Sequence, residues 1–178
     1  MTVILGIDPG SRLMGYGIIR HERSESIRIA SGCIKLPTTS PFATRLKKIF
    51  IELQEIIQCY APTEAAIEQV FFHINPNSAL KLGQARGAAL VAAAVAELAV
   101  HEYSARQVKQ SMVGYGAATK QQIQHMVRLL LKLEKLPQED EADALAIALC
   151  HAQSRSLPNN GALKSFTLKH GFRRGRMR

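Results

Sequence analysis

The chain lacks the features that mark secreted, membrane-spanning or disulfide-stabilised proteins. Its 178 residues include only three cysteines, Cys33, Cys59 and Cys150, an odd number without paired spacing. This usage indicates neither a disulfide framework nor a zinc cluster, and it fits a reducing cytoplasm. The longest apolar run, 87–96, is about half of the roughly 20 residues that cross a bilayer, and no signal peptide is recognisable. We therefore expect a cytoplasmic protein that makes no use of a membrane.

Several common catalytic motifs are also missing from the sequence. It contains no Walker loop and no Ser/His/Asp arrangement, and its six histidines show no metal-ligand spacing. Aspartate is scarce, since it occurs only as Asp8, Asp140 and Asp143. The rarity of this residue makes its three positions informative.

Positive charge is plentiful and unevenly distributed. The net charge is +9 and the pI is near 9.8, which favours a polyanionic partner such as nucleic acid. The segment 155–178 holds seven basic residues and no acid, which leaves +2 of the +9 for the rest. We predict one domain at 1–154 and a basic, flexible tail at 155–178 that could serve as a DNA-binding arm.

The first part of the chain predicts three strands in a meander. The apolar run 3–7 ends at the turn signal Asp8-Pro9-Gly10, and further strands are predicted at 16–20 and 27–36. Apolar residues then recur at helical spacing over 41–59, which predicts an amphipathic crossover helix. A right-handed crossover would place a fourth strand, 65–70, parallel to the first.

The second half predicts helices around one more strand. Segment 77–98 is rich in alanine and leucine and predicts a helix, whose Gly83-x-x-x-Gly87 spacing indicates tight packing on the sheet or a homodimer contact. A fifth strand is predicted at 100–103. Capping-box patterns at 104–107 and 119–122 then open two helices, and a last helix is predicted at 138–153. The fold class is therefore α/β, with a five-stranded mixed sheet flanked by helices.

Four acidic residues fall where such a fold would gather them. Asp8 and Glu68 end neighbouring parallel strands, and ligands collect beyond those ends. Asp140 and Asp143 lie three residues apart at the start of the last helix, so they could complete the cluster. Three of them have an ordinary alternative role: a turn residue for Asp8, a helix cap for Asp140, a solvent-facing strand position for Glu68. Asp143 shares a helical face with Ile147 and Cys150, so it points partly toward the apolar side, where a carboxylate needs a partner.

The chemistry predicted for this cluster is metal-dependent hydrolysis of a phosphodiester. Four carboxylates in one place repel each other unless cations bind among them. Oxygen ligands favour Mg²⁺, with Mn²⁺ as a substitute, and two such ions can activate water and stabilise a leaving oxygen. A basic protein with this site is expected to act on nucleic acid.

Ordered motifs spanning 6–148 resemble the RuvC family of Holliday-junction resolvases, which have the ribonuclease-H-like fold. They are Gly6-Ile7-Asp8-Pro9-Gly10-Ser11-Arg12, Ala66-Ile67-Glu68-Gln69-Val70-Phe71, the run from Ser78 to Gly87, Ala105-Arg106-Gln107-Val108-Lys109-Gln110, and Ala142-Asp143-Ala144-Leu145-Ala146-Ile147-Ala148. The resemblance implies a homodimeric Mg²⁺-dependent endonuclease for DNA recombination and repair. It would nick two opposing strands of a four-way junction and work with a branch-migration motor of the RuvA and RuvB type.

The resemblance also implies roles for individual residues. It assigns the acidic quartet to Asp8, Glu68, Asp140 and Asp143. It implies that Phe71 stacks on a base near the crossover, with a place in the core as its alternative. It further implies that Lys109 and Lys120 contact phosphate, although exposed lysines often serve only as solvated charges.

Two other functional classes can be weighed against this one. An actin-like or sugar-kinase ATPase also carries an Asp-x-Gly turn after its first strand. Such enzymes need two related halves, and 178 residues without a duplicate turn leave no space for them. A non-catalytic junction-binding protein, in which the acids only shape helix ends, stays open and would bind without cutting.

Overall fold

The computed structural model of the chain describes residues 1–70 and 76–156. Phe71 and nearly all of the predicted basic tail lie outside these described residues. No helix of the described ranges is long and apolar enough to cross a membrane. The elements follow one another as β1 (Thr2–Asp8), β2 (Leu13–Glu22), β3 (Glu25–Lys35), α1 (Phe42–Tyr60), β4 (Glu64–Glu68), α2 (Pro76–Val95), β5 (Ala99–Tyr103), α3 (Ala105–Val113), α4 (Lys120–Leu130) and α5 (Glu139–Ser156).

The strands form one mixed sheet in the order β3-β2-β1-β4-β5. β1, β2 and β3 pair antiparallel, which confirms the predicted meander. β4 lies parallel to β1, and β5 lies parallel to β4, as the crossover argument predicted. The connection between β2 and β3 is shorter than predicted, because both strands extend further and leave only Arg23 and Ser24 between them. Both residues adopt positive φ angles, which a two-residue hairpin turn requires.

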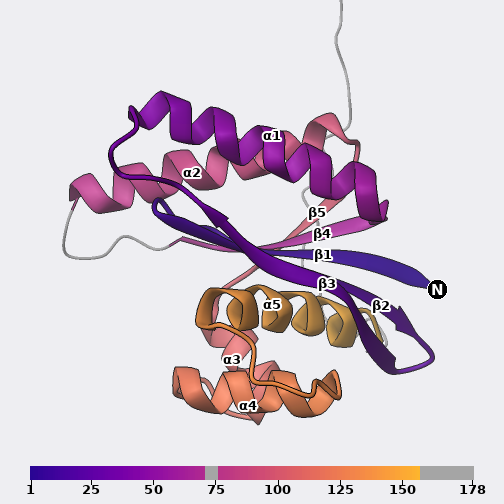
Figure 1. Ribbon diagram of the computed structural model, residues 1–178. Helices are drawn as coiled ribbons and strands as arrows, with labels where there is room; N and C mark the ends of the chain where they lie inside the picture. Colours follow the sequence, from indigo (N-terminus) through magenta and orange to yellow (C-terminus); the bar gives the residue numbers. More distant parts are fainter. Residues whose placement is uncertain (71–75, 157–178) are drawn as a thin grey trace, which may run out of the picture.

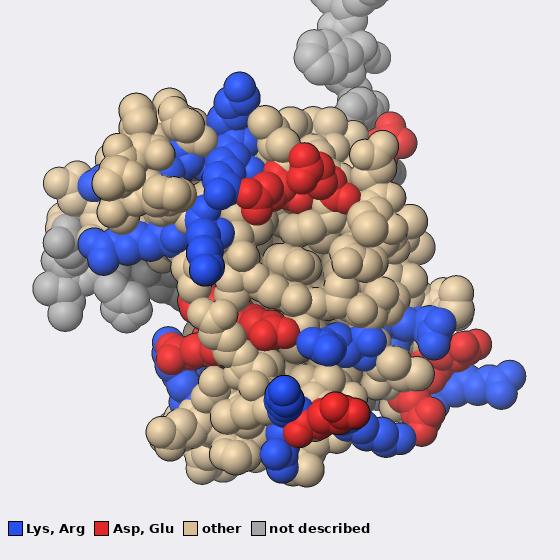
Figure 2. All heavy atoms as spheres, in the orientation of Figure 1, with Lys and Arg blue, Asp and Glu red and all other residues tan. Residues whose placement is uncertain are grey.

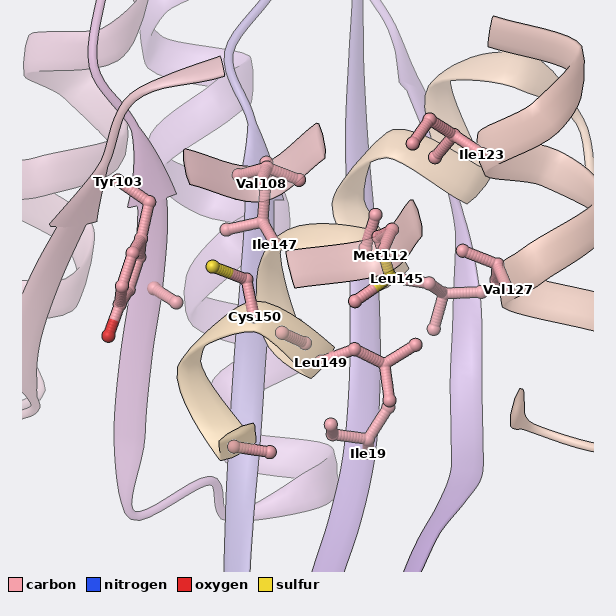
Figure 3. Close-up of a cluster of buried hydrophobic side chains, with 14 of the residues drawn as sticks. Ile19, Tyr103, Val108, Met112, Ile123, Val127, Leu145, Ile147, Leu149 and Cys150 are labelled. Atoms are coloured by element: carbon pink, nitrogen blue, oxygen red, sulfur yellow. The ribbon is translucent and has the colours of Figure 1, made fainter. Parts of the chain in front are cut away.

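Helices cover both faces of the sheet (Figure 1). α1 and α2 pack on one face over an apolar cluster that includes Leu5, Ile18 and Leu53. α5 covers the other face, and α3 and α4 pack on the outer side of α5 (Figure 1). A second apolar cluster lies here, and α5 contributes more side chains to it than any other element (Figure 3). Every residue from Ala144 to Ala152 is buried, so α5 is enclosed on all sides.

Glycines on the strands allow α5 to approach the sheet very closely. A Cβ added to Gly6 would lie 2.1 Å from the carbonyl oxygen of Ala144, and one added to Gly15 would lie 2.0 Å from that of Asp140. Any larger residue would therefore push the helix away. The close approach fixes the first turn of α5 beside the end of β1.

Both predicted capping boxes are present. The side chain of Ser104 accepts a hydrogen bond from the backbone N–H of Gln107, and Thr119 does the same with Gln122. In each pair the glutamine side chain accepts from the backbone N–H of the cap. The boxes fix the start of α3 and α4, two helices that form one wall of a pocket at the edge of the sheet.

The predicted sheet packing of the Gly83-x-x-x-Gly87 spacing is wrong. A Cβ added at either glycine would meet nothing within 4 Å. The spacing therefore faces away from the sheet, and the buried contacts of α2 come from other small residues: Ala85, Ala89, Ala92 and Ala93.

Candidate active site

Two of the predicted acids end adjacent parallel strands. Asp8 is the last residue of β1 and Glu68 is the last residue of β4. Register pairs Ile7 with Ile67, so the two acids emerge side by side at one edge of the sheet. This edge is at the left in Figure 1, where α5 also begins. The arrangement matches the prediction from strand order.

The other two acids approach from α5. Asp140 and Asp143 lie in its first turns, beside the edge where β1 ends. Asp8 pairs across the sheet with Gly15, and the missing side chain of Gly15 gives room to the backbone of Asp140. The glycine therefore determines how closely α5 can bring its acids to Asp8.

A pocket of about 310 Å³ lies between these elements. Three of the acids line it, together with two lysines and apolar residues of α3, α4 and α5. The lining consists of Asp8, Glu68, Ala105, Val108, Lys109, Lys120, Ile123, Asp143 and Ile147. Asp140 is absent from that lining, although its charge acts on Asp8. The pocket thus combines a negative floor with two positive side chains, and Figure 2 shows acidic and basic side chains close together at the level of the sheet.

The pocket raises the pKa of three of its carboxyl groups, so they ionise less readily than usual. The pKa of Asp8 is raised from 3.8 to about 8, first by burial and then by the negative charges of the other three acids. Burial, followed by the charge of Asp143, raises the pKa of Glu68, and burial is also the main cause of the raised pKa of Asp143. For both, two nearby lysine ammonium groups partly offset the rise. A bound divalent cation would favour the ionised forms, so this donor set fits a hard metal ion.

The four carboxylates do not converge as tightly as a complete ligand set would. In the described ranges, one group of three His, Cys, Asp or Glu side chains has ligand atoms all within 4.8 Å of one another, and it is Glu64, His101 and His151. The acids at the sheet edge are near enough to interact electrostatically, but no three of them meet that distance. Common ligation would therefore require their side chains to rotate inward.

The two predicted DNA-binding lysines differ in their surroundings. Lys109 is half-buried in the pocket wall on α3. Lys120 is exposed at the start of α4 and forms an ion pair with Glu139. A hydrogen bond from this ammonium group to Glu139, and the nearby acids, raise the pKa of Lys120. Both lysines line the pocket beside Asp8, Glu68 and Asp143.

Sequence reasoning missed one residue that holds the site in place. Arg86 of α2 donates from Nε to the backbone carbonyl oxygen of Glu68 at 3.0 Å, and its Nη2 lies 2.8 Å from Glu102 on β5. The guanidinium therefore ties α2 to the ends of β4 and β5. Its position in the run from Ser78 to Gly87 was a signal, but the contact to a backbone carbonyl is visible only in three dimensions.

Comparison with known proteins gives a consistent result. Residues 4–151 match the family model described as crossover junction endodeoxyribonuclease RuvC. A protein of that name from Idiomarina loihiensis is 59% identical over 158 residues, which cover 86% of this chain and 89% of that protein. Another, from Legionella pneumophila, is 52% identical over 178 residues, which cover all of this chain and 99% of that protein.

Solved structures agree with the sequence matches. The structure described as Thermus thermophilus RuvC in complex with Holliday junction substrate has a TM-score of 0.83 and 35% identity, and the match covers 88% of this chain and 96% of that one. The yeast mitochondrial Holliday junction resolvase Ydc2 has a TM-score of 0.62 but only 13% identity, so it shows the shared fold alone. The five-stranded α/β architecture is thus the ribonuclease-H-like fold of these resolvases.

Proposed function

Because the chain belongs to the RuvC family of crossover junction endodeoxyribonucleases, we propose that it resolves four-way DNA junctions by nicking two opposing strands symmetrically. The observation that carries this proposal is the pocket in which Asp8, Glu68 and Asp143 lie beside two lysines. The enzyme would act in the cytoplasm, in DNA recombination and repair. A branch-migration motor of the RuvA and RuvB type would be its cellular partner.

We propose that the acidic quartet Asp8, Glu68, Asp140 and Asp143 is the metal-binding and catalytic centre. Its support is electrostatic: burial and the charges of the other three acids raise the pKa of Asp8, burial and the charge of Asp140 contribute to the raised pKa of Asp143, and a divalent cation would remove that penalty. When bound, Mg²⁺, or Mn²⁺ in its place, supplies Lewis acidity and lowers the pKa of its water, and we infer two ions per site. The protein contributes rigid strand ends, and α5 supplies the remaining carboxylates.

The lysines are proposed to hold the phosphodiester against the carboxylates. Lys109 reaches the pocket from its wall and Lys120 from its rim, so the two ammonium groups can contact nonbridging oxygens of one phosphate. Phe71, outside the described residues, is proposed to stack on a base near the crossover, and it directly follows the Glu68-Gln69-Val70 run. The domain proposed for cleavage is 1–154, with the basic segment 155–178 adding unspecific attraction to DNA.

A homodimer is proposed to form through the outer face of α2. Leu80, Val91 and Val95 are 59%, 54% and 60% exposed, although all three are apolar. They lie on one helical face with Gly83 and Gly87, whose open space leaves the backbone accessible to a second helix. A two-fold axis through this face would give two active sites for two opposing strands.

The test of the function compares Asp143→Asn with Glu55→Gln, an exposed substitution on α1 outside the pocket. A synthetic four-way junction, a linear duplex and a single strand are incubated with each protein, with Mg²⁺ or with EDTA. We expect the unaltered chain and Glu55→Gln to cut only the junction and only with Mg²⁺. Asp143→Asn should bind the junction undiminished and cut at least about 1,000-fold more slowly, because a carboxylate ligand is lost. Undiminished cutting by Asp143→Asn would rule out its role, and binding without any cutting by the unaltered chain would favour a non-catalytic junction-binding protein.

A further inference from the structure

A second cluster of potential ligands lies at the opposite end of the same elements. Glu64 begins β4, His101 lies in β5, and His151 lies near the end of α5. Their ligand atoms are all within 4.8 Å of one another. His151 Nε2 is 2.6 Å from Glu64 Oε2, and the two imidazole rings stack with their centroids 4.3 Å apart. Three distant segments of the chain thus converge on one point.

This cluster is separate from the acidic pocket. Glu64 and Glu68 are four residue positions apart on β4, which corresponds to about 13 Å along a strand. Asp143 and His151 are eight residue positions apart on α5, which corresponds to about 12 Å along a helix. An ion in one site would not share ligands with an ion in the other.

Other side chains hold the cluster in orientation. The hydroxyl group of Tyr103 lies 2.7 Å from Nδ1 of His151, on the ring edge away from Glu64. Figure 3 shows that this hydroxyl points away from the labelled apolar side chains around it. The second carboxylate oxygen of Glu64 accepts from Arg155. Metal-binding histidines and carboxylates in proteins are characteristically held in this way by a second set of hydrogen bonds.

His101 completes the case because, among the described residues, no hydrogen bond that was found occupies its ring nitrogens. The hydrogen bonds found among residues 1–70 and 76–156 include none from its nitrogens, and its described contact is the stack on His151. Burial lowers the pKa of both imidazoles, that of His151 to about 4, so both rings are neutral at pH 7. Neutral imidazole is the form that binds a metal.

We propose that Glu64, His101 and His151 form a binding site for a borderline-soft divalent cation of the Zn²⁺ class. Two nitrogens and one oxygen are a ligand set that suits such an ion and not Mg²⁺. The ion replaces the hydrogen bond between His151 and Glu64. The proton of Nε2 moves to Nδ1, which then donates to Tyr103, whose hydroxyl hydrogen turns away, so the site releases no proton from this ring.

An ion bound at this site links separate elements of the fold. The ion ties the end of α5 to β4 and β5, and two of these elements, β4 and α5, carry Glu68 and the acids Asp140 and Asp143 at their other ends. Zn²⁺ should therefore stabilise the fold without entering the reaction.

The full-length protein, freed of metal with EDTA and then dialysed, provides the test. Zn²⁺ binding is measured by calorimetry, and Co²⁺ serves as a spectroscopic probe, since nitrogen ligation in a low-coordinate site produces intense visible bands. We expect one equivalent of Zn²⁺ to bind both the unaltered chain and Asp8→Asn. Tyr103→Phe should weaken this binding by about 10- to 100-fold, as loss of an orienting partner does, and His101→Gln should weaken it more.

Two results would overturn the proposal. One is Zn²⁺ binding of unchanged affinity and stoichiometry in both His101→Gln and Glu64→Gln, which would assign the ion to other histidines. The other is loss of the Zn²⁺ signal in Asp8→Asn, which would place the ion among the acids at the sheet edge. Circular dichroism shows that each variant is folded, and Mg²⁺-dependent junction cutting by His101→Gln should equal that of the unaltered chain.

Discussion

Replacement of Asp8 by asparagine should stabilise the metal-free protein at neutral pH. The folded state raises the pKa of this carboxyl group from 3.8 to about 8, so folding favours its protonated form. Stability from this group is therefore fully present below pH 4 and is lost as the pH rises through 8. At pH 7 the difference corresponds to at most roughly 4 kcal/mol, at about 1.4 kcal/mol for each tenfold change in acidity.

Side-chain rotation and water entry reduce that upper limit, so we expect a gain of about 2 kcal/mol for Asp8→Asn. For a chain of this size the gain corresponds to an increase in Tm of roughly 4–8 °C. Urea unfolding is measured in EDTA at a series of pH values from 4 to 8.5. The stability difference between the variant and the unaltered chain should be near zero at pH 4 and should grow steadily toward pH 8.

Added Mg²⁺ should reverse the order of stability. A ligand at 100 times its Kd stabilises the folded state by about 2.7 kcal/mol, and this gain should be smaller in Asp8→Asn. Glu55→Gln, which alters an exposed carboxylate on α1, is the matched control and should track the unaltered chain at every pH. The reasoning is refuted if the stability difference for Asp8→Asn is the same at pH 4 and pH 8, because burial and charge repulsion penalise only the ionised carboxylate.

Three further outcomes are expected. Gly15→Ala should cost about 1–3 kcal/mol in urea unfolding and should slow junction cutting further than its lower stability explains, because the added Cβ would lie 2.0 Å from the carbonyl oxygen of Asp140. Val91→Arg should shift the protein from dimer to monomer in sedimentation and convert paired cuts into single nicks, whereas an unchanged dimer would exclude the α2 face. Deletion of 157–178 should flatten the salt dependence of DNA binding by up to about 0.9 in log–log slope for each phosphate that the segment neutralises, and an unchanged slope would show that it neutralises none.

The sequence predicted those parts of the fold that depend on local pattern. Alternating and β-branched runs located all five strands, and the two capping boxes located the starts of α3 and α4. The position of Asp8 and Glu68 at one edge followed from a single topological rule, that a crossover connection returns a parallel strand beside the first. No side-chain geometry was needed for that step.

Features that depend on which faces meet could not be predicted in this way. The Gly83-x-x-x-Gly87 spacing is the same in sequence whether the face packs on the sheet or faces outward, and only the fold shows that it faces outward. The histidine spacing suggested no metal site, because His101 and His151 are fifty residues apart and meet only when α5 crosses β5. Long-range convergence of this kind leaves no periodic trace in a single sequence.

The acidic pocket and the packing of α5 have opposite effects on the stability of the fold. Grouping carboxylates at the end of β1 destabilises the fold, as the raised pKa of Asp8 shows, so other contacts must hold the acids together. The contacts are those of a helix that is buried on every side and pressed against Gly6 and Gly15. Because the helix is packed so closely, it cannot move away to relieve the repulsion, and a divalent cation offers the remaining relief. In the proposed function, the apolar core on this face of the sheet therefore acts directly on the chemistry, since it sets how strongly the carboxylates of the pocket would attract a metal.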